Sequence, residues 1–178
     1  MDQAQSFDAC ELVNTYDEQG LMQILRDYGE LRSAGKIAQA IVKRRQEVKI
    51  ETTSQLNEIL MHFFSETNRN KLLAMAYQAL RIEVNQELKA LKSMLTQATD
   101  LLKPNGRLCV IAYHSLEDRL VKRFIKNGNF TNEPLKDFYG NSLSKLKQVG
   151  KPVVPNDNET KQNNRARSAR MRIAQKVG

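Results

Sequence analysis

Apolar residues recur at every third or fourth position over the first two-thirds of the chain, where glycine and proline are scarce, and this spacing is typical of helices. Three short helices are expected first, at residues 18–27, 31–46 and 54–64. Asp17 is placed to cap the first of them, and Thr52 or Thr53 the third. A longer stretch with the same spacing, from about residue 71 to 95, predicts a fourth helix. The pattern therefore predicts a compact helical unit and then one long helix.

The pattern changes after residue 103. The tripeptide Pro104-Asn105-Gly106 predicts a tight turn, and the apolar run 107–113 that follows it is short enough for a buried strand. Ser115 is a candidate cap for a helix over residues 116–126. The polar stretch 127–140 contains glycine and proline and predicts an irregular loop.

Two weaker strands are expected near the C-terminal end, at residues 147–154 and 168–177. In the second, Met171 and Ile173 alternate with arginines, which predicts a half-exposed strand with the arginines on its polar face. The polar residues 155–164 would connect the two strands. The sequence thus predicts a mixed α/β chain.

The strand at 107–113 is too apolar for the partners that the sequence offers it. Such a strand belongs in the middle of a sheet with both faces covered, yet the other two candidate strands are partly polar. Either another chain covers its edge, or the sequence begins partway through a larger fold. An uncovered edge of this kind invites self-association.

The chain of 178 residues carries a formal net charge of +8. The basic residues concentrate at the end, because residues 161–178 hold six Lys and Arg side chains and no acid, whereas residues 1–25 hold five acids and no base. An anionic partner is expected, and a membrane span is excluded by the mean hydropathy of −0.56 and the lack of a long apolar run. Two distant cysteines without metal-like spacing, and no signal peptide, predict a cytoplasmic protein without a metal site.

Three groups of residues are candidates for a site. His114 and Ser115 follow the apolar strand, where ligands gather in open α/β sheets; the alternative is an ordinary helix cap and a loop residue. Arg81 and Asn85 stand four apart and could present donors from one helix face, or belong to a solvated face. The terminal arginines could contact phosphates, or protect the polar face of an edge strand; they are Arg165, Arg167, Arg170 and Arg172.

Three blocks of sequence are specific enough for a comparison with known families: YQALRIEVNQEL at 77–88, LLKPNGRLCVIAYHSLEDRLVKRF at 101–124 and NNRARSARMRIAQK at 163–176. They closely resemble the RsmH/MraW family, and so do the helical stretches at 28–45 and 51–60. The resemblance implies a Rossmann-like class I methyltransferase fold interrupted by an all-helical inserted domain. Residues 1–68 would be the insertion with its leading segment, and residues 69–178 the C-terminal half of the methyltransferase domain.

The resemblance implies methylation of the exocyclic N4 of a cytidine in 16S ribosomal RNA, with S-adenosylmethionine as the donor. The partner would be small-subunit ribosomal RNA or the 30S subunit. The cytosine amine would attack the methyl sulfonium while a polar acceptor removes the amine proton. On this mapping the helical unit and the arginine-rich end would hold the RNA, and Arg81, Asn85, His114 and Ser115 would line the active site.

The family's main cofactor motifs, a glycine-rich loop of the GGGGHS type and a DLGVSS segment, do not occur in this sequence. The resemblance therefore predicts a truncated chain without the main contacts to the methyl donor. The alternatives are a non-catalytic fragment or RNA-binding module, and a two-chain enzyme whose other polypeptide supplies the first half.

Overall fold

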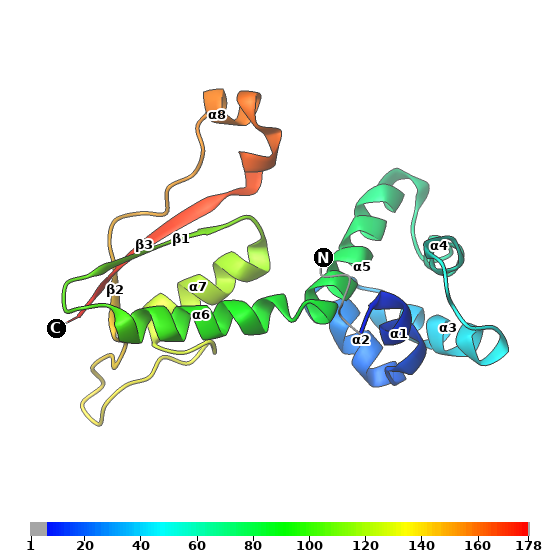
Figure 1. Ribbon diagram of the computed structural model, residues 1–178, viewed down its shortest axis with the longest axis horizontal. Helices are drawn as coiled ribbons and strands as arrows, with labels where there is room; N and C mark the ends of the chain where they lie inside the picture. The colour runs from blue at the N-terminus through cyan, green and yellow to red at the C-terminus, as the bar shows by residue number, and fades with distance from the viewer. Residues whose placement is uncertain (1–6, 178) are drawn as a thin grey trace. The chain divides into compact units, whose positions relative to one another are not determined.

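The chain divides into two compact units, Met1–Glu87 (unit 1) and Leu88–Gly178 (unit 2), and the computed structural model describes residues 7–177 of it. Helices make up unit 1, whereas unit 2 combines helices with a small sheet (Figure 1). The chain is thus a mixed α/β protein, as predicted. The expected division near residue 68, between an inserted domain and half of a methyltransferase domain, stays a prediction.

Unit 1 is a helical cluster around one apolar core. Its elements are α1 (Ala9–Thr15), α2 (Glu18–Asp27), α3 (Ala34–Glu47), α4 (Thr53–Met61), the 3-10 turn η1 (Glu66–Asn68) and α5 (Arg69–Val84). Leu12, Leu21, Ile37 and Leu60 come from four different helices and are almost fully buried together. The three short helices predicted from the spacing are confirmed, whereas α1 was not predicted as a separate element.

The caps of these helices follow the sequence closely. The Asp17 carboxylate accepts a hydrogen bond from the Gly20 amide at 2.8 Å, as predicted for the start of α2. At α4 the cap is Thr52 and not Thr53. The Thr52 hydroxyl accepts from the Gln55 amide, and the Gln55 side chain accepts from the Thr52 amide, so the two residues form a capping box.

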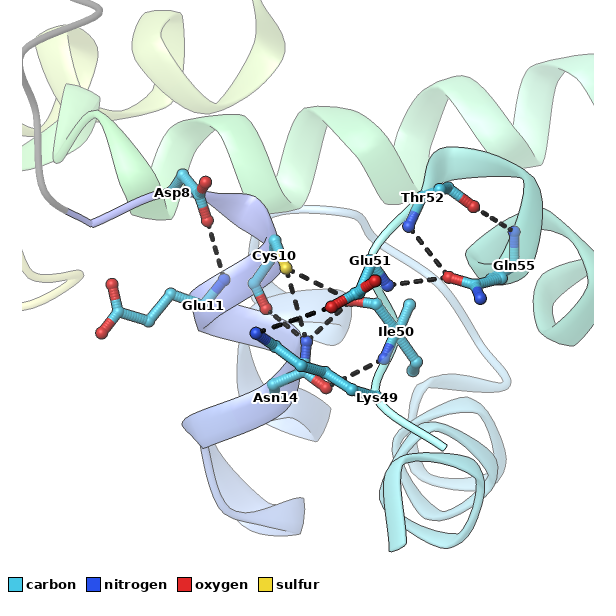
Figure 2. A network of polar contacts seen from close by, with 9 residues as sticks. All are labelled: Asp8, Cys10, Glu11, Asn14, Lys49, Ile50, Glu51, Thr52 and Gln55. Atoms are coloured by element: carbon cyan, nitrogen blue, oxygen red, sulfur yellow. Dashed lines mark hydrogen bonds and ion pairs between the residues drawn. The ribbon is translucent and has the colours of Figure 1, made fainter. Parts of the chain in front are cut away.

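Helix α1 is joined by side-chain hydrogen bonds to the segment that precedes α4, as Figure 2 shows. The Asn14 amide donates to the Ile50 carbonyl at 2.8 Å, and the Ile50 amide donates back to the Asn14 side-chain oxygen at 3.1 Å. The Cys10 thiol donates to the same carbonyl. Asn14 thus satisfies both backbone groups of a buried residue in a non-helical segment.

The prediction of a single long helix over residues 71–95 is wrong. Helix α5 ends at Val84, and a new helix, α6 (Glu87–Leu101), begins after two residues. Gln86 lies in the left-handed region with φ of 51°, and its amide bonds to the Glu83 carbonyl. A left-handed residue cannot continue a right-handed helix. The apolar spacing did not reveal the break because it continues across these two residues.

Unit 2 is built on three strands, β1 (Arg107–Ala112), β2 (Leu146–Gln148) and β3 (Arg170–Lys176). The order is β1-β3-β2, and both pairs are antiparallel. Helices α6 and α7 (Ser115–Asn127) cover one face, where Leu95, Val110, Val121 and Ala174 form the core (Figure 1). The segment between β2 and β3 contains α8 (Asp157–Gln162) and the 3-10 turn η2 (Asn164–Ser168), whereas a plain polar connection was expected there.

Strand β3 lies at the centre of the sheet, so the alternative of an edge strand is wrong. Its faces are also reversed from the prediction, because Arg172 and Ala174 are buried while Met171 and Ile173 are only partly covered. The reason is Asp118 of α7, which binds the Arg172 guanidinium beneath the sheet. A specific ion pair has here decided which side chains of an alternating strand turn inward.

Strand β1 lies at one edge of the sheet and not in its middle. Within residues 7–177, β1 pairs with β3 alone, and Cys109 and Ile111 on its second face are exposed. Within these residues β1 thus has the uncovered edge that the sequence predicts from the lack of suitable partner strands, and the two explanations for it stay predictions. Self-association through this edge stays a prediction.

Candidate functional site

A cavity of about 660 Å³ lies in unit 2 beside the C-terminal end of β1. Residues 113–122, at the end of β1 and in the first turns of α7, supply part of its lining, and residues 167–172, in η2 and β3, supply most of the rest. The structure thereby brings together five of the residues that the sequence singled out: His114, Ser115, Arg167, Arg170 and Arg172.

His114 is both a lining residue and the N-cap of α7. Its Nδ1 accepts a hydrogen bond from the Leu116 amide at 3.2 Å, while the amides of Tyr113 and His114 donate to one Glu117 carboxylate oxygen. The bond from Leu116 holds the imidazole ring in place, and because Nδ1 acts as an acceptor, the ring proton of the neutral form is on Nε2. The prediction that Ser115 caps this helix is wrong, because Ser115 is the first residue of α7.

In the sequence HSLED, each of His114 and Ser115 is followed three residues later by an acid, Glu117 and Asp118. Asp118 does not form a capping box with Ser115, because both of its carboxylate oxygens bind Arg172, at 2.6 and 3.0 Å. Glu117 is left to complete the box with His114. A tertiary contact therefore selects which residue begins the helix.

The cavity lining is strongly basic. It carries five cationic side chains, those of Arg119, Lys122, Arg167, Arg170 and Arg172, against the single carboxylate of Asp118. Arg172 is only 6% exposed and takes both oxygens of Asp118, and Arg170 approaches the same carboxylate at 3.9 Å. One acid cannot balance this charge, so an anion is the ligand that the lining favours.

The sequence did not single out Asp118, Arg119 or Lys122 as site residues. The sequence did contain a signal for them, because Ser115, Asp118, Arg119 and Lys122 stand at positions i, i+3, i+4 and i+7, which lie on one face of a helix. What the sequence lacked was the position of β3 against this face.

Three of the residues proposed from the sequence are not gathered at the cavity. Arg165 lies in η2 but does not line it. Arg81 and Asn85 belong to unit 1, where both bind the Glu87 carboxylate; the Arg81 contacts are 2.9 and 3.2 Å and the Asn85 contact is 3.1 Å. A ligand at Arg81 and Asn85 would have to displace Glu87, and the roles of these residues stay predictions.

S-adenosylmethionine, the donor that the resemblance implies, is a poor fit to this cavity. Its sulfonium is a cation, which would meet the excess of arginine and lysine side chains. The carboxylate that could offset this repulsion is Asp118, whose oxygens are occupied by Arg172. The lining therefore suits a polyanion better than this cofactor.

No cluster of three or more His, Cys, Asp or Glu side chains that could hold a metal ion occurs among residues 7–177. Within the same residues, no helix has both the length and the apolarity needed to cross a membrane.

Comparisons with known proteins agree with the resemblance found in the sequence. The model of the MraW methylase family matches residues 1–177. The chain is 53% identical over 177 residues to ribosomal RNA small subunit methyltransferase H of Flavobacterium johnsoniae, covering 99% of this chain and 59% of that protein. The proteins of the same name from Christiangramia forsetii and Amoebophilus asiaticus are 48% and 51% identical, with 59% and 57% of their lengths covered. The chain thus spans less than two thirds of the curated relatives it matches.

Proposed function

This chain belongs to the MraW methylase family, and we propose that it is the RNA-holding part of an enzyme that methylates 16S ribosomal RNA. The target would be the exocyclic N4 of a cytidine, and S-adenosylmethionine would supply the methyl group. Both assignments come from the family, whose relatives are named as small-subunit ribosomal RNA methyltransferases. The 30S subunit or its RNA is the partner, and the reaction takes place in the cytoplasm, where ribosomal RNA is found.

The observation that carries the proposal is the basic cavity at the end of β1. Arginine side chains match the geometry of phosphate oxygens, and Arg167 and Arg170 reach the cavity from consecutive elements, η2 and β3. RNA backbone contacts of this kind supply affinity and position without reading the sequence.

His114 and Ser115 have a more specific role in this proposal. The Nε2–H of His114 and the hydroxyl of Ser115 are donors on the lining, at the start of α7, where the positive end of the helix dipole also favours an anion. They would contact the sugar or phosphate next to the target nucleotide. Such contacts position the base for reaction, because a small displacement of reacting groups lowers the rate steeply.

The salt dependence of RNA binding tests whether the arginines of the cavity contact phosphates. The wild-type chain and the double variant Arg167→Ala/Arg170→Ala would be titrated with a 16S ribosomal RNA transcript at several salt concentrations. Each lost phosphate contact is expected to reduce the slope of log K against log salt by about one. Arg26→Ala in unit 1 is a matched control, because the Arg26 side chain is 59% exposed and that of Arg170 is 56% exposed. An unchanged slope in the double variant, or an equal change in Arg26→Ala, contradicts the proposal.

A non-catalytic RNA-binding module is the second candidate, favoured by the poor match between the basic cavity and a sulfonium cation. Titration calorimetry with S-adenosylmethionine, and transfer of a labelled methyl group to 16S ribosomal RNA, separate the two candidates. RNA binding without cofactor binding or methyl transfer supports a module that holds the RNA. N4-methylcytidine in a digest of the product supports catalysis by these residues themselves.

A further inference from the structure

The loop between α7 and β2 ends in a tip with two adjacent aromatic side chains. Phe138 is 98% exposed and Tyr139 is 86% exposed, and their rings meet edge to face with centroids 5.7 Å apart. The loop extends away from the helices and strands of unit 2 (Figure 1, yellow). The residues 136–142 are called the aromatic tip below.

The aromatic tip is held by its own hydrogen bonds. Lys136 and Ser142 form an antiparallel bridge, and the Asp137 amide donates to the Asn141 carbonyl at 3.0 Å. One Asp137 oxygen accepts from the amides of Tyr139 and Asn141, and the other accepts from the Asn141 side chain at 2.9 Å. Gly140 has a φ of 87°, a conformation that favours glycine. The sequence DFYGN therefore builds a closed turn and not a random loop.

The base of this loop is joined to the end of α7. The Leu135 amide donates to the Asn127 carbonyl and the Leu143 amide to the Leu135 carbonyl, both at 2.9 Å. The Ser144 hydroxyl donates to the Ile125 carbonyl at 2.9 Å. Both arms of the loop are thus fixed to the fold, and the two rings are presented from a preorganised support. Binding to them costs little additional ordering.

The charge around the aromatic tip indicates what kind of partner would cover it. Residues 126–151 contain five exposed lysines, one of which, Lys145, is paired with Asp100, whereas their two acids are Glu133 and Asp137, and the Asp137 oxygens are used within the turn. An apolar protein groove would desolvate these lysines at a cost. A single-stranded nucleic acid offers flat bases to the rings and phosphates to the lysines.

We propose that Phe138 and Tyr139 form a stacking platform for unpaired bases of the RNA, separate from the basic cavity. This inference rests on the proposed function, since it takes RNA as the ligand. Stacking on an aromatic ring tolerates any base, so the aromatic tip adds affinity and placement without reading a sequence. The cavity and the aromatic tip then bind the RNA by different physical means, charge in one case and stacking in the other.

Affinity measurements on the full 178-residue chain test this inference. The variant Phe138→Ala/Tyr139→Ala is expected to bind a single-stranded RNA oligonucleotide of mixed sequence about fivefold to a hundredfold more weakly. Its slope of log K against log salt should stay unchanged, because no charge is removed. The control Leu101→Ala removes a side chain of unit 2 that is as exposed as Tyr139, at 86%, and should bind like wild type. Phe138→Tyr keeps an aromatic ring and should also retain affinity.

A spectroscopic signal distinguishes stacking from a general loss of affinity. The sequence contains no tryptophan, so Phe138→Trp places a single indole in the aromatic tip. Bases that stack on this indole quench its emission, and the quenching should follow the same binding curve as the RNA titration. Leu101→Trp, with its indole in a comparably exposed position of α6, should show no such quenching.

The outcomes separate this inference from the proposed function. Wild-type RNA binding with unchanged affinity in the double alanine variant overturns the stacking platform and leaves the cavity proposal standing. Failure of the wild-type chain to bind RNA at all overturns both. Self-association of the wild type that the double alanine variant abolishes identifies a second copy as the partner, and overturns the inference as well. Circular dichroism of each variant checks that the fold is kept.

Discussion

The two units of this protein differ in how completely each buries its own apolar side chains. Of the large apolar residues that are exposed between residues 7 and 177, Val48 and Met61 belong to unit 1 and all the others belong to unit 2. Unit 1 also uses its polar side chains internally, for caps and for the Asn14 contacts. Unit 2 instead directs an apolar strand face, an aromatic tip and a basic cavity toward the outside.

This difference separates stability from binding. The apolar residues of unit 1 pack against one another, so mutations among them are expected to act on stability. Exposed aromatic and basic groups on a small sheet do little for the fold, so they fit the recognition of another molecule. The ion pair of Asp118 and Arg172 is an exception. It lies at the cavity, where a ligand would bind, but the Arg172 side chain is buried, so the pair should also contribute to stability.

The largest effect on stability is expected from that ion pair. Asp118→Asn leaves the buried Arg172 guanidinium without its counter-charge, and should lower the free energy of unfolding by about 3–5 kcal/mol. This free energy can be measured by urea denaturation monitored by circular dichroism. The control is Asp100→Asn, which removes an exposed partner of Lys145 and should leave the unfolding midpoint nearly unchanged. Equal effects of the two variants would show that Asp118 acts as an ordinary surface charge.

A core truncation in unit 1 should be almost as damaging but should leave binding intact. Ile37→Ala in α3 removes a fully buried side chain and should destabilise the protein by about 2–5 kcal/mol. Ile111→Ala on the exposed face of β1 should change stability far less. RNA affinity measured well below the melting temperature should match wild type for Ile37→Ala. A selective loss of RNA binding there would contradict the division between the units.

The Asn14 contacts should contribute a smaller amount. Asn14→Ala removes the partner of both backbone groups of Ile50, and leaving a buried amide unpaired should cost about 1–3 kcal/mol. Thermal melting of this variant can be compared with that of Thr15→Ala, which removes an exposed hydroxyl bonded within the same helix. If both variants melt alike, Asn14 does not hold α1 to the segment before α4.

Alkaline pH should weaken unit 1. Burial raises the pKa of Tyr16 above its ordinary value of 10.0, and the hydrogen bond to Glu83 raises it further. Burial likewise raises the pKa of Tyr28 and of Tyr77. A raised folded-state pKa means that the stabilisation is complete below about pH 10 and is lost as the pH rises through the folded-state value. Ultraviolet titration of the phenolates alongside circular dichroism should show ionisation together with helix loss, and Tyr16→Phe should reduce that dependence.

Acid should loosen the aromatic tip, and this is the smallest expected effect. The hydrogen bond from the Asn141 side chain lowers the pKa of Asp137 below its ordinary value of 3.8, and backbone amides of the turn lower it further. A lowered folded-state pKa gives stabilisation that is present above about pH 4 and lost as the pH falls through the folded-state value. The protection factors of the Tyr139 and Asn141 amides, which compare each exchange rate with the intrinsic rate at the same pH, should therefore fall in acid. Asn141→Ala should show weaker protection already at neutral pH.

Local features of this protein were predictable because neighbouring residues decide them. The spacing of apolar residues located α2, α3 and α4, and Asp17 caps α2 as expected. The tripeptide before β1 forms a turn in which Asn105 has a φ of 64°, as short polar side chains tolerate. The gathering of His114 and Ser115 with Arg167 and Arg170 was only partly predictable. Each residue stood out by its type or place in the sequence, but nothing local indicated that β3 returns to the end of β1.

The predictions that failed concern contacts between distant residues. The break between α5 and α6 escaped detection because a two-residue interruption does not disturb the apolar spacing. The aromatic tip was read as an irregular loop, since the bonds of Asp137 to Tyr139 and Asn141 depend on how the turn closes.

The sequence by itself determined the family, the helical character of unit 1, the presence of strand β1 and the excess of positive charge near the C-terminal end. These follow from residue types, spacing and similarity, which need no knowledge of distant contacts. The tertiary structure decided which face of β3 is buried and which residue caps α7, because Asp118 binds an arginine 54 residues away. Burial of a charge requires a specific partner, so only the folded chain could show where this arginine turns inward.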